Sequence, residues 1–450
     1  MKAIILSAGE SKRMHSKTPK ALHKVLGKPI LHYVIEACEG AGINEIVVVV
    51  GRQAEAVKAA TPYKVVFAVQ EVLLGTGHAV MAANAHIKDE DIMVICGDAP
   101  LLTGEVLSGI AARFDDGSGA DALVVSVRVD DPYGYGRVVT DGDAFLRITE
   151  QRDLSKNPGD DVNDIWTGVM CFKGAALHYG LSRITNDNAQ GEYYLTDVPG
   201  VLCCAGRNVQ VYPYPGSFET FGGVNTKAQL ADAAAVMRRR VNAALMDSGV
   251  ELLDPMTAYI DGCAVIEPDV TVYPNVIIEG NCRIAEGAVI GPNTRLTNSV
   301  VGRNSSVQYS VLVDAVVGEG TAVGPFAYLR PEAVVGDHCK IGDFVEIKKA
   351  SIGNGSKVPH LSYVGDAEVG SGVNIGCGAI TANYDGEKKS RTVIEDGAFV
   401  GCNSNLVAPV RIGADAFVAA GSTITDEVPN GALAIARQRQ VNKAGRSRKG

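Results

Sequence analysis

Residues 394–424 read IEDGAFVGCNSNLVAPVRIGADAFVAAGSTI, with an aliphatic side chain at every sixth position: Ile394, Val400, Leu406, Ile412, Val418 and Ile424. The same spacing recurs over Ile266–Ile290 and Val317–Ile347, and a glycine follows many of these residues. Neither an α-helix nor an alternating β-strand repeats every six residues. A short fixed period over most of the second half predicts a solenoid of stacked parallel β-coils.

The composition is that of an ordinary globular protein. A chain of 450 residues is too long for one core, so we expect two or three domains. The net charge of −9 argues against a general nucleic-acid or membrane binder. Ten cysteines lack Cys-x-x-Cys spacing, which indicates reduced thiols rather than a disulfide framework or zinc site. No segment is apolar enough to span a bilayer, and we expect a cytoplasmic protein.

Residues 1–225 alternate strand-like and helix-like segments. Helical patterns such as Ile30–Ala41 and Thr76–Ala85 separate apolar runs of strand length. These runs are Ala3–Leu6, Ile46–Val50, Val65–Ala68, Ile92–Ile95 and Ala122–Val127. The pattern predicts a mostly parallel sheet covered on both faces, with ligands at the carboxyl ends of its strands.

Three further segments complete the predicted organisation. Residues 226–248 are alanine-rich without glycine or proline and predict one linker helix. Residues 249–436 contain the six-residue repeats. Residues 437–450 form a basic tail, whose charged residues are Arg437, Arg439, Lys443, Arg446, Arg448 and Lys449. This tail is either simply solvated or in contact with an anion.

The loop after the first predicted strand has what a nucleoside triphosphate requires. Ser7, Ala8 and Gly9 let backbone N–H groups turn toward a ligand, and Arg13 and Lys20 supply positive charge. The loop is neither a Walker A loop nor a Rossmann fingerprint. Its glycine turn alone could be a plain strand-to-helix connection, but the cations that follow favour nucleotide binding.

A second loop, Cys96-Gly97-Asp98, follows another predicted strand. A carboxylate at this end of a strand can hold a divalent ion against phosphates. It can equally cap the following turn. The residues of this loop alone do not decide between the two roles.

Further segments of the first half define a resemblance. They are Gln70, Leu74–His78, Tyr133–Arg137, Glu150–Asp153, Asn188–Asp197 and Gly223–Asn225. Together with the two loops they resemble the uridylyltransferase half of the bacterial bifunctional N-acetylglucosamine-1-phosphate uridylyltransferase/glucosamine-1-phosphate acetyltransferase family. The resemblance covers nearly the whole chain. It implies an α/β nucleotidyltransferase domain with a Rossmann-like, mostly parallel sheet, followed by a left-handed parallel β-helix of hexapeptide repeats.

The resemblance implies roles for residues of the first half. Arg13 and Lys20 neutralise the triphosphate as catalytic residues, and Asp98 and Asn225 hold Mg²⁺. The residues expected around UTP and the UDP-sugar are Leu6, Ser7, Ala8, Gly9, Lys20, Gln70, Gly75, Thr76, Cys96, Gly97, Asp98, Gly136, Glu150, Trp166 and Asn225. The sugar phosphate is already an anionic nucleophile, so this transfer needs positioning and charge neutralisation but no general base.

Two places in the first half depart from the family. Ser11-Lys12 stands where the family has Gly-Thr, and Lys12 could contact phosphate or be solvated. Trp166 stands where the family has an asparagine that contacts the sugar nucleotide. An indole cannot replace the paired donor and acceptor of an amide. Either Trp166 stacks on the sugar, or the amide contact is lost and uridylyl transfer is weakened.

The six-residue pattern slips near Val358–His360 and breaks at Asn383–Arg391, a polar and charged insert. Such an insert could be a harmless surface loop. However, the neighbouring coils concentrate residues that a structural solenoid does not need: Arg330, Glu346, Lys348, Lys349, His360, Tyr363 and Asn374. The segments around them resemble the acetyltransferase half of the same family, which uses acetyl-CoA.

Acetylation of an amine requires a proton acceptor, and histidine is suited to that role. His360 is the expected base, whereas His338 lies in a turn and is expected at the surface. The resemblance implies that glucosamine 1-phosphate contacts Arg330, Lys348, Tyr363, Asn374 and Lys389. It implies that acetyl-CoA contacts Cys377, Asn383, Tyr384, Cys402, Ala420 and Arg437. The family has alanine and serine in place of Cys377 and Cys402, and we expect a modest effect on affinity.

The resemblance therefore implies a two-site enzyme of UDP-N-acetylglucosamine synthesis. It acetylates glucosamine 1-phosphate with acetyl-CoA, then transfers a uridylyl group from UTP with Mg²⁺ and releases pyrophosphate. It also implies a homotrimer with acetyltransferase sites between protomers. The alternatives are a single-activity sugar-1-phosphate nucleotidyltransferase with a structural β-helix, and a non-catalytic trimeric scaffold.

Overall fold

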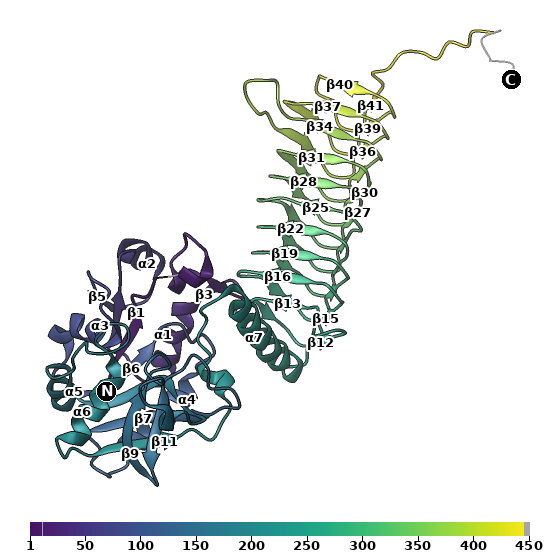
Figure 1. Cartoon of the computed structure of the whole chain (residues 1–450). Coiled ribbons are helices and arrows are strands. Elements are labelled where there is room, and N and C mark those ends of the chain that lie inside the picture. The colour runs from purple at the N-terminus through teal and green to yellow at the C-terminus, as the bar shows by residue number, and fades with distance from the viewer. Residues whose placement is uncertain (11, 445–450) are drawn as a thin grey trace. The chain divides into compact units, whose positions relative to one another are not determined.

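The computed structural model describes residues 1–10 and 12–444, and the chain forms two compact units, Met1–Met237 and Arg238–Gly450 (Figure 1). The predicted helix is confirmed as α7 (Lys227–Asp247), and the boundary between the two units lies inside it. The functional boundaries at residues 225, 248 and 436 stay predictions. The described part of the chain does not include Ser11, the Lys12 side chain, or the tail residues Arg446, Arg448 and Lys449.

The first unit is built around a nine-stranded sheet whose main path runs β11-β7-β10-β6-β1-β4-β5, with β8 and β9 beside it. The strands are β1 (Lys2–Ser7), β4 (Ile46–Val50), β5 (Val66–Val69), β6 (Asp91–Cys96), β7 (Ala122–Arg128), β8 (Arg137–Asp141), β9 (Ala144–Thr149), β10 (Asp164–Lys173) and β11 (Val209–Pro213). All five predicted strands are confirmed. The sheet is parallel along its main path except for β10, which runs antiparallel to both neighbours.

The strands are apolar throughout because both faces of the sheet are covered. Alternate residues enter different cores: Ile5 and Val48 belong to one core, and Ile4 and Val47 to the other. Helices α1 (Ile30–Gly40), α2 (Ala54–Ala60) and α4 (Gly104–Phe114) contribute to the first core. Helices α3 (Thr76–Ala82), α5 (Gly174–Leu181) and α6 (Val198–Cys204) contribute to the second. No described helix is long and apolar enough to cross a membrane.

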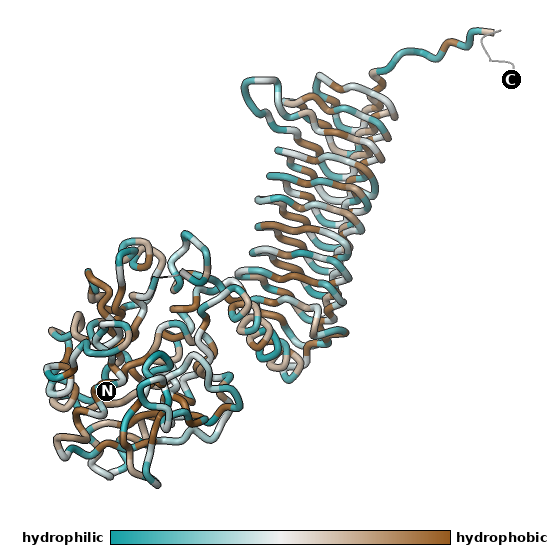
Figure 2. Tube along the Cα trace, in the orientation of Figure 1, coloured by the Kyte–Doolittle hydropathy of each residue, from teal (hydrophilic) through white to brown (hydrophobic). Residues whose placement is uncertain are grey.

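The second unit is a β-helix of three parallel sheets with eleven, ten and nine strands. Every aliphatic residue of the three six-residue runs lies in one continuous core. Figure 2 shows the resulting alternation of hydrophobic and hydrophilic residues around the coils. The solenoid prediction is confirmed, and its physical basis is that each short strand buries one side chain while its neighbours face outward.

The insert at Asn383–Arg391 lengthens one coil. Val400 pairs with Ile375, 25 positions earlier, whereas Val418 pairs with Val400, 18 positions earlier. The extra residues fold back on themselves, since the Ser390 N–H donates to the Asn383 carbonyl at 2.9 Å. The Asp385 carboxylate accepts hydrogen bonds from two backbone N–H groups, which lowers its pKa. Figure 1 shows the insert extending from the β-helix near its C-terminal end.

Candidate active sites

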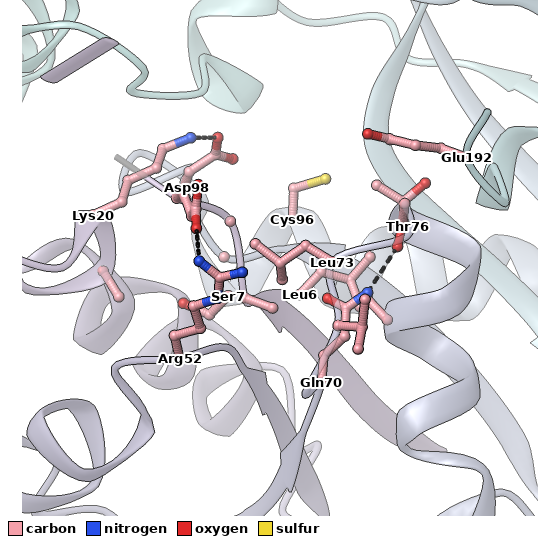
Figure 3. A pocket seen from close by; sticks show the side chains of 18 residues that line it. Leu6, Ser7, Lys20, Arg52, Gln70, Leu73, Thr76, Cys96, Asp98 and Glu192 are labelled. Carbon is pink, nitrogen blue, oxygen red and sulfur yellow. Dashed lines mark hydrogen bonds and ion pairs between the residues drawn. The ribbon is translucent and has the colours of Figure 1, made fainter. Parts of the chain in front are cut away.

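The first unit has a pocket of about 630 Å³ at the carboxyl ends of β1 and β6 (Figure 3). Eleven predicted residues line it: Leu6, Ser7, Ala8, Gly9, Lys20, Gln70, Gly75, Thr76, Cys96, Gly97 and Asp98. Leu6–Gly9 and Cys96–Asp98 meet because β1 and β6 are parallel neighbours, so both following loops open on the same edge of the sheet. The Gly97 N–H donates to the Leu6 carbonyl at 2.9 Å, and a Cβ at Gly97 would lie 2.9 Å from that oxygen.

Opposite these loops, Gln70 and Thr76 are fixed by the surrounding chain. The buried Gln70 side chain donates from Nε2 to the Gly75 carbonyl at 3.1 Å. Thr76 Oγ1 accepts from the Leu195 N–H at 3.0 Å. Gly75 has φ of 105°, and a Cβ there would lie 2.5 Å from the Tyr193 carbonyl oxygen. The motif at residues 188–197 therefore closes against the motif at residues 74–78.

Lys20 joins the two expected metal ligands. Its ammonium forms an ion pair with Asp98 and donates to Asn225 Oδ1 at 2.7 Å. Arg13 donates to the same Asn225 oxygen at 2.8 Å. Carboxylate and amide oxygens are ligands suited to Mg²⁺, and both already converge on one cationic group. Among the described residues no group of three or more His, Cys, Asp or Glu side chains could hold a metal ion.

A second pocket of about 590 Å³ adjoins the first, and Lys20 lines both. Arg13, Glu150 and Asn225 also line the second pocket. A Cβ at Gly136 would lie 3.5 Å from Glu150 Oε1, so these two predicted sugar contacts are neighbours. Burial raises the pKa of Glu150, although Thr196 donates to its Oε1 at 2.9 Å and opposes the change.

Trp166 lines neither of these two pockets. Its indole Nε1 donates to the Val169 carbonyl at 3.2 Å, within an irregular stretch of β10. Its backbone N–H donates to the Gly136 carbonyl at 2.9 Å. The only side-chain donor of Trp166 is thus used inside the protein. This geometry favours the interpretation in which the family's amide contact is lost.

Arg52 was missed by the sequence analysis. It lines the 630 Å³ pocket (Figure 3) and forms an ion pair with Glu10 at 3.3 Å. No motif surrounds it. The one feature that could have indicated its role is its position just beyond β4. Because β4 runs parallel to β1, its carboxyl end lies at the same edge of the sheet as the pocket.

In the second unit, His360 and Asp343 end strands β30 (Lys357–His360) and β27 (Lys340–Asp343). The two residues are register partners on successive coils, and His360 Nδ1 lies 2.6 Å from Asp343 Oδ1. The hydrogen bond with His360 lowers the pKa of Asp343. The sequence analysis missed Asp343, because the one feature that could have indicated it is its position one coil before His360. His338 is exposed, which confirms its expected surface position.

The predicted phosphate contacts gather on neighbouring coils. Lys348, in β28 (Glu346–Lys348), lies close enough to Lys389 of the insert to lower the pKa of Lys389, because two neighbouring ammonium groups repel each other. Two adjacent ammonium groups favour an anion. Arg330 pairs with Glu346 at 2.7 Å, and Tyr363, in β31 (Tyr363–Gly365), is the register partner of Glu346.

Asn383 and Tyr384 begin the insert. The Asn383 amide donates to Asp366, which the sequence analysis did not single out, and to the Tyr363 hydroxyl at 3.5 Å. The exposed Tyr384 hydroxyl donates to the Gly386 carbonyl at 2.5 Å. Asn374, in β33 (Asn374–Ile375), belongs to the sheet of His360, whereas Tyr363 belongs to the next one. The predicted set therefore spans two faces of the β-helix.

The other predicted acetyl-CoA contacts follow one corner of successive coils. The Asn403 N–H donates to the Cys377 carbonyl and the Gly421 N–H to the Cys402 carbonyl, each at 2.7 Å. A Cβ at Gly401 would lie 2.5 Å from the Ala420 nitrogen, and one at Gly421 would lie 3.8 Å from Arg437 Cδ. Cys377, Cys402, Ala420 and Arg437 thus form one row, as an extended ligand requires.

Comparisons with known proteins agree with both halves. Residues 3–157 match the MobA-like NTP transferase domain, and residues 263–298, 314–349 and 391–426 match the bacterial transferase hexapeptide (six repeats). The chain is 47% identical to the bifunctional protein GlmU of Carboxydothermus hydrogenoformans, covering 98% of this chain and 99% of the relative. It is 47% identical to that of Heliobacterium modesticaldum, covering 100% and 98%, and 46% identical to that of Brevibacillus brevis, covering 98% and 96%. The chain therefore belongs to the family of bifunctional GlmU proteins, with uridylyltransferase and acetyltransferase activities.

Proposed function

We propose that the two reactions occur at the two sites described above, one in each unit. In the second unit glucosamine 1-phosphate is acetylated by acetyl-CoA. In the first unit the product, N-acetylglucosamine 1-phosphate, receives a uridylyl group from UTP. The observation that supports this assignment is the gathering of predicted residues in the two pockets that Lys20 lines in the first unit. In the second unit it is supported by the proximity of Lys348 to Lys389 and by the hydrogen bond from Asn383 to Tyr363.

The first site suits a transfer between two phosphates. UTP would occupy the 630 Å³ pocket, and the sugar phosphate would occupy the adjoining pocket beside Glu150. Lys20 lines both pockets, so its ammonium can contact phosphate oxygens of both substrates as the new P–O bond forms and pyrophosphate leaves. Arg13 adds a second cation in the sugar-side pocket.

Asp98 and Asn225 are the residues that would hold Mg²⁺. When bound, the ion would neutralise charge on phosphate oxygens. The Lys20 ammonium now rests between these two oxygens.

At the second site, His360 accepts a proton as the sugar amine attacks the thioester of acetyl-CoA. The C–N bond forms, the C–S bond breaks, and coenzyme A leaves as the thiol. Lys348 and Lys389 hold the phosphate of the sugar. The homotrimer and the cytoplasmic location are proposed from the family resemblance. Sedimentation that showed a fully active monomer would contradict the trimer.

The test is a pair of assays on the purified full-length chain. One measures free thiol released from acetyl-CoA with glucosamine 1-phosphate. The other measures pyrophosphate released from UTP with N-acetylglucosamine 1-phosphate. His360→Ala should lower only thiol release, by about a hundredfold or more, and Asp98→Ala should lower only pyrophosphate release.

His338→Ala is the matched control, because it removes an exposed histidine from an earlier coil of the same β-helix. It should leave both rates at the parent value. Thiol release that survived in His360→Ala would show that the base is another residue. A parent protein that released pyrophosphate but no thiol would favour a single-activity nucleotidyltransferase.

A further inference from the structure

We propose that Asp343 is a positioning residue for acetyl transfer, holding the His360 ring through Nδ1 so that Nε2 remains to accept the proton. This inference rests on the proposed role of His360 as the base. Asp343 is the one residue whose side chain is shown to hydrogen-bond the His360 ring within the described part of the chain.

The arrangement is built into the backbone of the β-helix. Strands β27 and β30 are each four residues long, twice the length of many strands in this unit, and the final residue of each is Asp343 or His360. The pairing of Asp343 with His360 continues the pairing of Ile341 with Val358 in the core. The polar pair is therefore held in line by the same register that stacks the buried aliphatic residues.

Gly342 permits this close stacking. A Cβ at position 342 would lie 1.8 Å from the Pro359 carbonyl oxygen, a distance that no side chain can occupy. On the other side of the histidine, the buried Ser362 hydroxyl lies 2.8 Å from the His360 carbonyl and 3.2 Å from that of Gly376. The main chain on both sides of His360 is thus held in place, by Gly342 against Pro359 and by Ser362 at the His360 carbonyl.

The contact determines which ring nitrogen carries a proton. The Asp343 carboxylate is ionised, because its hydrogen bond with the ring lowers its pKa below the ordinary value. An ionised carboxylate can only accept, so at 2.6 Å the proton lies on Nδ1. In the neutral ring Nε2 then has the free lone pair, as a general base requires.

The proposal predicts a specific kinetic defect. Asp343→Ala should lower kcat for thiol release about ten- to one-hundred-fold and leave both KM values within twofold, because the substrate contacts remain. Formate supplies a free carboxylate at the vacated position, so millimolar formate should restore part of kcat. Asp343→Asn retains an oxygen acceptor and should keep most of kcat. A purely structural role of Asp343 would not respond to formate.

Two controls separate the possible failures. Glu319→Ala removes an exposed carboxylate from an earlier coil and should keep the parent rate, with no response to formate. Pyrophosphate release and the unfolding curve show whether each variant is folded. A kcat for Asp343→Ala within twofold of the parent, or a loss that formate does not restore, overturns the positioning role. If His360→Ala also retained thiol release, the base assignment itself would fail.

Discussion

Asp197 lies in a cluster of carboxylates in the first unit, and its removal should stabilise that unit at neutral pH. Burial raises the pKa of Asp197 from 3.8 to about 6, and the nearby charges of Glu150 and Asp153 add to the effect. Asp197 precedes helix α6, but its side chain makes no capping hydrogen bond there. Asp197→Asn therefore removes an unfavourable charge with little loss of contact.

The sign and size of the effect follow from the change in pKa. A carboxyl whose pKa is higher in the folded protein than in the unfolded chain holds its proton more tightly when folded. Stability therefore falls as the pH rises from about 4 to about 6, and the whole penalty remains above that range. A difference of about two pH units corresponds to about 3 kcal/mol. Because Asp197 is partly exposed, screening by solvent reduces the expected penalty to about 1–2 kcal/mol.

Trp166 provides the assay, since it is the only tryptophan and lies in the first unit. Its fluorescence during urea unfolding reports on that unit. At pH 7.5 Asp197→Asn should be about 1–2 kcal/mol more stable than the parent, and at pH 4 the two should converge. Asp187→Asn, which changes an exposed carboxylate of a nearby loop, should show no such pH dependence. A difference between Asp197→Asn and the parent that is equal at both pH values would refute the reasoning.

Two further predictions concern stability. Ile347→Ala creates a cavity at a fully buried position of the β-helix and should lower the free energy of unfolding by about 2–5 kcal/mol. Val334→Ala is the control, because Val334 is 46% exposed and its truncation should cost less than about 1 kcal/mol. Equal losses of the two variants in calorimetry would contradict the burial argument. Trp166→Phe retains an aromatic ring but leaves the Val169 carbonyl without its indole donor, and it should destabilise the first unit by about 1 kcal/mol. Thermal unfolding followed by circular dichroism measures the effect, and an unchanged melting temperature would show that this hydrogen bond contributes nothing.

Much of the proposed nucleotide site could be predicted from local sequence. Ser7, Ala8, Gly9 and Asp98 follow apolar strands directly, and parallel strands bring such loops to one edge of a sheet. Strand β10 was not predicted, because its antiparallel position depends on pairing with distant β6 and β7. Arg52 was missed for a related reason: it enters the site through the place of β4 in the sheet and has no motif around it.

The proposed acetyltransferase site shows the same limit of prediction from local sequence. The insert and His360 were visible because they interrupt a regular pattern. Asp343 does not interrupt it, and the partner of His360 becomes clear only when the coil length is known. Trp166 is a third case, because its sequence position alone left two roles open, and its place outside the lining of the two pockets favours the loss of the contact.

The sequence by itself determined that the second half is a solenoid, because a side chain buried every sixth residue admits almost no other fold. Through the family resemblance, its motifs also predicted the chemistry proposed for both sites. Only the tertiary structure decided which side chains meet. Lys20, Asp98 and Asn225 converge from distant parts of the chain, and Asp343 meets His360 across one coil. The physical reason is that strand order and coil register arise from the packing of the whole core, which no local segment specifies.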